Sequence, residues 1–239
     1  MRIYADCRPA GSTPPDAVPH EVNLSSQFVD AGGMPLPSGL ALAPGTTTLW
    51  VSRRPSGSGP GAVLRFNANT SLYEGAFASP GAFSSAMCFD GRELWLADYV
   101  SGASRLFRLA TDGRVLANLP SPLTSLAHGE AGLDGDSNHM YFAEHVDNRN
   151  TGERGSRIVE FDRTTGRVLR VVFSSTTAMI TSLAVRDGSL WFVSRPFTGP
   201  DVGPRALLWH SGWATGWQRA ATSLSARTAT ECAATTSTD

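Results

Sequence analysis

A repeated hydrophobic pattern runs along most of the chain. Four times, an aliphatic residue or methionine is followed directly by a large aromatic residue, at Leu49-Trp50, Leu94-Trp95, Met140-Tyr141 and Leu190-Trp191. The spacings between these pairs are 45, 46 and 50 residues. Each pair follows a short apolar stretch, at 39–43, 86–89, 126–128 and 183–185. Apolar runs of this length, bounded by polar turns, are typical of β-strands.

Turn residues separate these stretches and predict how they pair. Asp90-Gly91 and Asp187-Gly188 join the first stretch to the aromatic pair in two of the units. Asp-Gly favours a tight hairpin because a type I′ turn needs positive φ at both central positions. A third apolar stretch follows in every unit, at 63–66, 106–109, 158–161 and 206–209, and a fourth is visible at 115–116 and 168–173. The sequence therefore predicts an all-β fold, a β-propeller of four-stranded antiparallel blades, with four blades legible.

The repeat also suggests the domain organisation. Residues 1–19 are expected to form a loose N-terminal segment, 20–218 the propeller domain, and 219–239, a run of Ala, Thr and Ser, a disordered tail. Apolar residues at even spacing make 20–29 a strand candidate, which we expect to complete the last blade and close the ring. The alternatives are an open arc of four blades and a fragment of a larger propeller.

Composition and charge narrow the classes of partner. The chain has 239 residues, of which 41% are hydrophobic, with 24 Gly and 15 Pro, as suits a loop-rich all-β domain. The formal net charge of -1 gives no electrostatic basis for binding nucleic acid or an anionic membrane surface. No stretch approaches the roughly 20 apolar residues needed to span a bilayer, and residues 1–7 lack the apolar core of a signal peptide. We expect neither nucleic acid nor membrane as a partner.

The third unit departs from its siblings. In our alignment of the repeats, it has His128 where the other units have Leu42, Cys88 and Val185. The same alignment gives it a longer first hairpin and a long polar loop after its second strand. Carboxylates and imidazoles gather in these two segments, at Asp134, Asp136, His139, Glu144, His145 and Asp147. Such side chains can bind a divalent ion or act as a general acid or base.

Propeller geometry divides this group in two. The first hairpin of a blade and the loop after its second strand lie on opposite faces of the disc, so Asp134, Asp136 and His139 should lie on one face and the remaining residues on the other. His128, on the innermost strand, and Glu144, at the end of the neighbouring strand, are then the candidates for catalysis or for metal binding in the central channel. The competing interpretation is a hydrogen-bonded strand histidine beside solvated carboxylates.

The repeat units also resemble those of a known superfamily. Residues 90–98, which read DGRELWLAD, and residues 133–144 resemble the first half of the propeller repeat of virginiamycin B lyase-like proteins, and 157–166, RIVEFDRTTG, resemble its second half. NHL-repeat and gluconolactonase-like proteins share this pattern, and the resemblance covers residues 36 to 210. It implies a propeller fold and a metal-dependent lyase or lactonase activity with a divalent ion such as Ca²⁺ or Mg²⁺. His128 and Glu144 would match the histidine and glutamate of the lyases.

Two functional hypotheses follow. The first is a non-catalytic propeller that binds a small-molecule or protein ligand through the loops at 53–61, 99–104, 145–156 and 195–205. These loops are equivalent by repeat and should share one face, and loops on a rigid scaffold are common recognition sites. The second is the lyase or lactonase, in which the ion would polarise a carbonyl while a channel histidine moves a proton.

Overall fold

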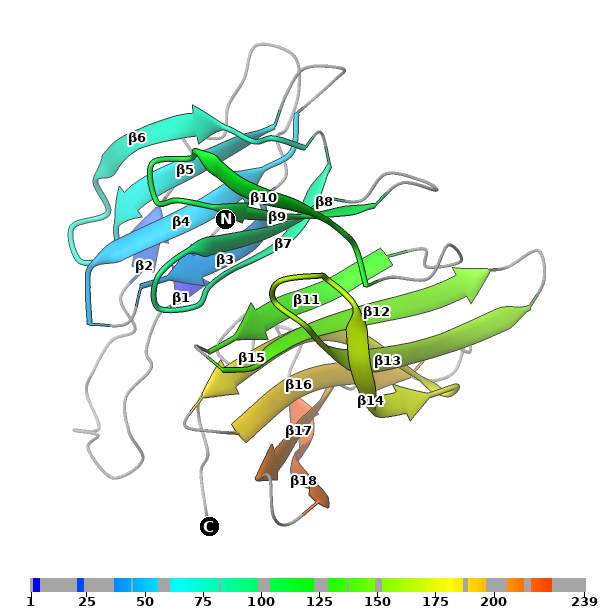
Figure 1. Cartoon of the computed structure of the whole chain (residues 1–239). Helices are drawn as coiled ribbons and strands as arrows, with labels where there is room; N and C mark the ends of the chain where they lie inside the picture. The colour runs from blue at the N-terminus through cyan, green and yellow to red at the C-terminus, as the bar shows by residue number, and fades with distance from the viewer. Residues whose placement is uncertain are drawn as a thin grey trace.

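The computed structural model confirms the predicted all-β propeller architecture. It describes residues 2–4, 21–23, 37–43, 45–55, 61–81, 83–98, 104–122, 129–136, 138–148, 152–186, 189–196, 206–212 and 216–224, and the structural statements that follow concern these residues. Four antiparallel sheets of four strands each follow one another along the chain (Figure 1). Most of the predicted N-terminal segment and residues 225–239 of the predicted tail lie outside the described residues.

Each blade is a simple meander in which consecutive strands pair. Blade one contains β3 (Pro37–Leu42), β4 (Thr48–Arg53), β5 (Ala62–Asn67) and β6 (Tyr73–Ala78). Blade two contains β7 (Ser84–Phe89), β8 (Leu94–Asp98), β9 (Arg105–Leu109) and β10 (Val115–Pro120). Blade three contains β11 (Gly129–Gly135), β12 (Met140–Asn148), β13 (Glu153–Phe161) and β14 (Val168–Ser175). Blade four contains β15 (Ala178–Arg186), β16 (Ser189–Pro196), β17 (Ala206–Gly212) and β18 (Gly216–Leu224).

Neighbouring blades are held together by hydrophobic clusters, because alternate residues of each strand point to opposite faces of its sheet. Trp50 and Val63 of blade one pack with Leu94 and Leu96 of blade two. Trp95, also of blade two, packs instead with blade three. A third cluster joins blades three and four through Tyr141, Ala143, Ile158, Ile180, Leu190 and Phe192. Three of the four aromatic anchors, Trp50, Trp95 and Tyr141, are therefore core residues between blades.

The innermost strands approach one another closely at one repeat position. In each blade, a small residue of the innermost strand lies opposite the residue that comes two places after the aromatic anchor. These small residues are Gly39, Ala86, Gly132 and Ser182. A Cβ at Gly39 would lie 2.7 Å from the backbone nitrogen of Met87, and one at Gly132 would lie 2.8 Å from that of Leu183. Small residues at this position let adjacent blades stack backbone to backbone.

This contact leads to a test of the packing. Gly132→Val is expected to lower the free energy of unfolding by about 2 kcal/mol or more, because the added side chain would push β15 away from β11. Gly155→Val is the matched control, since a Cβ there meets its nearest neighbour, the carbonyl oxygen of Ser175, at an ordinary 3.4 Å. Chemical denaturation measures both. Equal losses would contradict the close approach of the inner strands.

The N-terminal strand does not complete the last blade, so that prediction was wrong. β2 (Glu21–Asn23) pairs with β1 (Arg2–Tyr4) in a separate two-stranded sheet, and blade four is completed by β18. Within the described part of the chain, the inner strands contact one another in the order β3, β7, β11, β15, with no comparable contact between β15 and β3. Among the same residues, no helix is long and apolar enough to cross a membrane.

Candidate functional site

The strand register of blade three differs from the one we predicted. β11 spans Gly129–Gly135, whereas residues 126–128, including His128, lie outside the described residues. The residue that faces the aromatic anchor is Asp134, opposite Tyr141. It matches Cys88, opposite Trp95, and Ala41, opposite Trp50. The polar substitution on the innermost strand is therefore Asp134, and the predicted long insertion is a short turn at 136–139.

Asp134 connects two blades. Its Oδ2 accepts a hydrogen bond of 2.7 Å from the backbone N–H of Val185 on β15. Burial of the carboxyl group raises its pKa to about 6, although backbone hydrogen bonds from Val185 and Gly135 act in the opposite direction. Burial also raises the pKa of the Cys88 thiol, and the negative charge of Asp134 adds to that effect. Sequence reasoning assigned Asp134 to a loop and missed this position.

Glu144 lies in β12, close to the level at which this strand extends beyond the other strands of its blade. Its side chain is 4% exposed and forms an ion pair with Nε of Arg157, which is directly opposite on β13. Phe142, two residues earlier on the same face of the sheet, packs toward blade two, so Glu144 faces that side as well. The structure thus assigns Glu144 an arginine partner, while the pairing with His128 stays a prediction.

Beyond His145, which still pairs with Gly129 of β11, β12 and β13 continue as a two-stranded ribbon. Three residue pairs form it, namely Val146↔Gly155, Asp147↔Arg154 and Asn148↔Glu153. In blade two, β8 ends at Asp98, which is the repeat equivalent of Glu144. The segment predicted as a long polar loop is therefore mostly strand. The ribbon extends to the right-hand side of the molecule in Figure 1.

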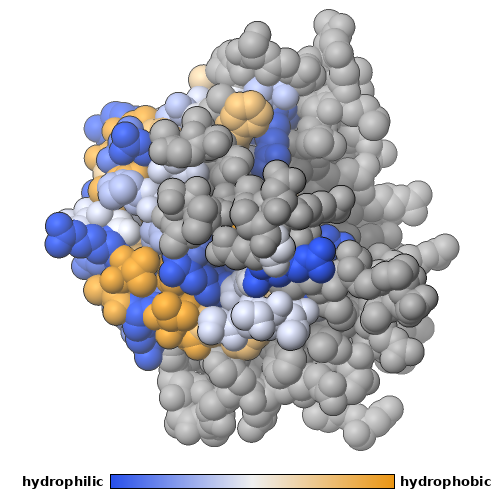
Figure 2. All heavy atoms as spheres, turned by 90° about the vertical axis from the view of Figure 1, so that its right-hand side faces the viewer, coloured by the Kyte–Doolittle hydropathy of each residue, from blue (hydrophilic) through white to orange (hydrophobic). Residues whose placement is uncertain are grey.

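A groove of about 600 Å³ lies at the base of this ribbon. Its described lining residues are Glu144, Val146, Arg154, Gly155, Ser156, Arg157, Ser174, Ser175, Thr176 and Thr177. Glu144, Arg157 and Ser174 form one row across β12, β13 and β14. Figure 2 views the molecule from the side to which the ribbon extends, where hydrophilic described residues lie near the middle and hydrophobic ones gather toward the left edge. The volume is in the range of pockets that hold small organic ligands.

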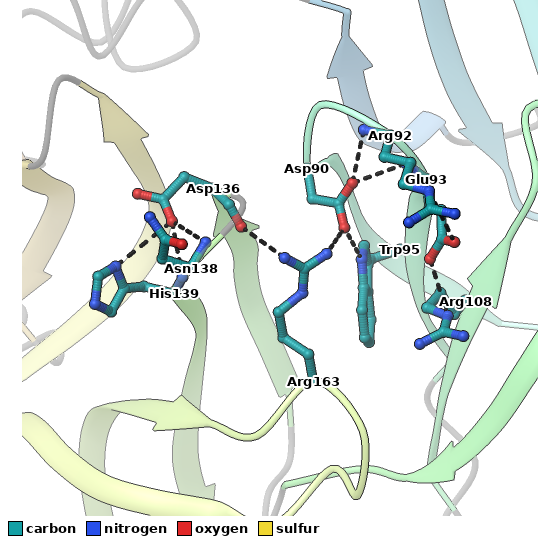
Figure 3. A network of polar contacts seen from close by, with 9 residues as sticks. All are labelled: Asp90, Arg92, Glu93, Trp95, Arg108, Asp136, Asn138, His139 and Arg163. Atoms are coloured by element: carbon teal, nitrogen blue, oxygen red, sulfur yellow. Dashed lines mark hydrogen bonds and ion pairs between the residues drawn. The ribbon is translucent and has the colours of Figure 1, made fainter.

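A second polar network lies at the opposite end of the blades (Figure 3). Arg163, on the turn between β13 and β14, forms an ion pair with Asp90 of blade two and donates a hydrogen bond of 3.3 Å to the carbonyl oxygen of Asp136. Its guanidinium carbon lies 5.8 Å from the centre of the Trp95 ring. This network joins turns of blades two and three. His139 lies there too, 3.5 Å from Asp136 through its Nδ1, which confirms that these two residues are at the opposite end of β12 from Glu144.

The described residues do not form a binding site for the divalent ion that the family resemblance implies. The Glu144 carboxylate is neutralised by a guanidinium, which competes with any cation for the same oxygen atoms. No group of three His, Cys, Asp or Glu side chains among the described residues is close enough to hold a metal ion. We therefore derive no step through a metal.

Comparison with known proteins identifies the fold and no family. No protein-family model matches the sequence, and no curated protein matches it. Among solved structures, the Kuenenia stuttgartiensis hydrazine synthase is 11% identical over 78% of this chain and 53% of that chain, with a TM-score of 0.51. This chain therefore spans about half of its length. The likeness agrees with the propeller fold and, at this identity, extends no further.

Two other solved structures share less of the arrangement. A subtype N10 neuraminidase-like protein of A/little yellow-shouldered bat/Guatemala/060/2010 is 12% identical over 78% of this chain and 58% of that chain, with a TM-score of 0.49. The Neurospora crassa Pan2 WD40 domain is 12% identical over 78% of this chain and 53% of that chain, with a TM-score of 0.45. At these values neither likeness adds to the argument.

Proposed function

We propose that this chain is a non-catalytic β-propeller scaffold that binds a ligand or protein partner through one face. The observation that carries the proposal is the groove at the base of the β12–β13 ribbon. It lies beside the segment 145–156, one of the four repeat-equivalent loop segments predicted to form the binding face. A rigid blade that positions an extended ribbon and a groove is well suited to recognition.

The state of Glu144 supports a binding role over a catalytic one. A general base must accept a proton from its substrate, whereas the Oε1 atom of Glu144 is already in an ion pair with the Arg157 guanidinium. The polar lining of the groove is dominated by hydroxyl groups and arginines, which can make hydrogen bonds to a ligand.

The alternative is a metal-dependent lyase or lactonase of the virginiamycin B lyase or gluconolactonase type. Besides the resemblance of the repeats, one feature of the strand pairing favours it. Gly129, which directly follows His128 in the sequence, is paired with His145, and Glu130 is paired with Glu144. His128 therefore remains our candidate partner of Glu144 for catalysis or for binding Ca²⁺ or Mg²⁺.

A shortened ribbon tests the proposal. Replacing residues 147–154 with Asn-Gly would join Val146 to Gly155 through a two-residue hairpin turn. We expect the variant to keep its β-sheet circular dichroism and cooperative unfolding. A panel of small organic acids, phosphate esters and sugars is then screened by thermal shift against both proteins. Ligands should raise the melting temperature of the natural chain more than that of the variant, which lacks Arg154 and the ribbon beside the groove.

Mass spectrometry of the same mixtures distinguishes the two functions. Recovery of each ligand unchanged is expected for a binding scaffold. Conversion of a lactone to its hydroxy acid, or of an ester to an elimination product, would instead support the alternative, above all if it required added Ca²⁺ or Mg²⁺. Stabilisation of the shortened variant equal to that of the natural chain would overturn the role of the ribbon in the binding face.

A further inference from the structure

Arginine 157 gives the groove its most distinctive chemistry. Its Nε donates a hydrogen bond to Glu144, and no further hydrogen bond or ion pair of this side chain is found among the described residues. Nη1 and Nη2 carry four further N–H donors, arranged in a plane that suits the oxygen pair of a carboxylate or phosphate. The side chain is 28% exposed, so a ligand in the groove can reach it. Glu144 holds the guanidinium in one orientation and so prepares it for a second acceptor.

Residues with hydroxyl groups line the groove together with Arg157. Ser174 is paired with Arg157 in the register of β13 and β14, so both side chains are on the same face of the sheet. Thr176 lies two residues further on and also lines the groove. Both hydroxyl groups are exposed and make no hydrogen bond among the described residues. Hydroxyl groups can donate to an oxyanion or accept from a ligand hydroxyl.

Shape and charge add to this arrangement. Gly155 is opposite Val146, and its missing side chain leaves open space at the groove, because an added Cβ would meet only the carbonyl oxygen of Ser175, at 3.4 Å. The described lining contains two arginines, whose guanidinium N–H groups can donate hydrogen bonds to an anion. The described lining contains no aromatic side chain, so stacking on the apolar face of a neutral sugar is not provided there.

We propose that the groove binds the oxyanion of a small, hydroxylated metabolite, with the carboxylate or phosphate held by Arg157 and the ligand hydroxyls held by Ser174 and Thr176. This inference rests on the proposed function and names the chemistry of its ligand. Carboxylate and phosphate share the same planar recognition by arginine, so the experiment distinguishes the two sources.

Three probes with related carbon skeletons separate the possibilities. Gluconate carries a carboxylate, glucose 6-phosphate carries a phosphate, and glucose carries neither. Isothermal titration calorimetry on the full chain should show binding of gluconate or glucose 6-phosphate, whichever oxyanion is preferred, and at least about tenfold weaker binding of glucose, since a hydrogen bond to a charged group contributes this much.

Two variants place the binding in the groove. Gly155→Val fills the open space and should weaken oxyanion binding roughly tenfold or more while leaving stability nearly unchanged. Glu144→Gln combined with Arg157→Gln removes both charges together, so no unpaired buried carboxylate remains, and should have the same effect on binding. Arg170→Gln is the matched control, because Arg170 also pairs through Nε with a glutamate, Glu160, on the neighbouring strand but does not line the groove. It should bind like the natural chain.

Each other outcome overturns this inference. If glucose binds as well as the two anions, the oxyanion is not what the groove recognises. If oxyanion binding survives Gly155→Val, the site is elsewhere. If none of the three probes binds, the ligand class is wrong, while the proposed function is still decided separately by the shortened ribbon.

Discussion

Replacing Arg163 with alanine is expected to lower the free energy of unfolding by about 2–4 kcal/mol, the largest loss that we expect from a single polar side chain of this protein. The Asp90 side chain is completely buried and would lose its only guanidinium partner among the described residues. It would still accept hydrogen bonds from Trp95 Nε1 at 2.8 Å and from the backbone N–H of Glu93 at 2.8 Å. A buried negative charge without a counter-ion would nevertheless remain between blades two and three.

The estimate is below that for a fully buried pair because 27% of the Arg163 side chain is exposed, and water can partly replace it. Arg170→Ala is the control in the same blade, since its side chain is 58% exposed in its pair with Glu160 and should cost less than about 1 kcal/mol. Urea denaturation followed by Trp fluorescence compares the two variants. A loss no larger for Arg163→Ala than for the control would show that the turn network does not hold the blades together.

Asp134→Asn is expected to stabilise the protein by about 1–2 kcal/mol at pH 7. The pKa of Asp134 is raised from 3.8 to about 6, so the folded protein binds this proton more tightly than the unfolded chain. Between pH 4 and pH 6 the unfolded chain is ionised while the folded protein is still protonated, and stability therefore falls as pH rises through this window. Asparagine removes the charge, and its side-chain oxygen can still accept the hydrogen bond from Val185. The expected gain in stability is smaller than the free energy that corresponds to the full pKa shift, because Asp134 is only partly buried.

The pH profile provides the decisive measurement. Denaturation curves of the natural chain and the variant should converge near pH 4 and separate progressively toward pH 6, after which the difference stays constant. Cys88→Ala is the control at the same repeat position in blade two, and it should shift the curve without changing its slope in this window. A difference between the natural chain and Asp134→Asn that is the same at pH 4 and pH 7 would contradict a raised pKa of Asp134 in the folded protein.

The sequence was sufficient to predict the architecture because the aromatic anchors fill the spaces between blades. Trp50 and Trp95 each fix the second strand of a blade, and the strands on either side follow from turns and spacing. The innermost strand of blade three was misplaced for a physical reason. It contains three glycines and two carboxylates, which have low strand propensity and are more common in loops. Tertiary contacts with blade four hold this segment as a strand. Gly132 leaves room for the backbone of blade four, and the backbone N–H of Val185 donates a hydrogen bond to Asp134.

The candidate site was only partly predictable for a related reason. Glu144 was found because it ends a clear apolar strand, but its partner Arg157 could be recognised only from the pairing of β12 with β13. The β12–β13 ribbon lacks the alternation of apolar and polar residues. Among the described residues, its strands pair with each other and take no part in the hydrophobic clusters between blades. The sequence of such a segment resembles that of a loop. The groove beside it could not be predicted, because it forms only when β12 and β13 pair in this segment.

The separate hydrophobic clusters between successive blades have a thermodynamic consequence. Because each cluster draws on only two adjacent blades, the energy of the fold is a sum of nearest-neighbour terms, as in a one-dimensional array. A substitution between blades two and three, such as Arg163→Ala, and one between blades three and four, such as Gly132→Val, therefore act through different terms. Both interfaces include blade three, which also carries the groove, so a ligand bound there would be linked to the folding of a blade that takes part in two interfaces.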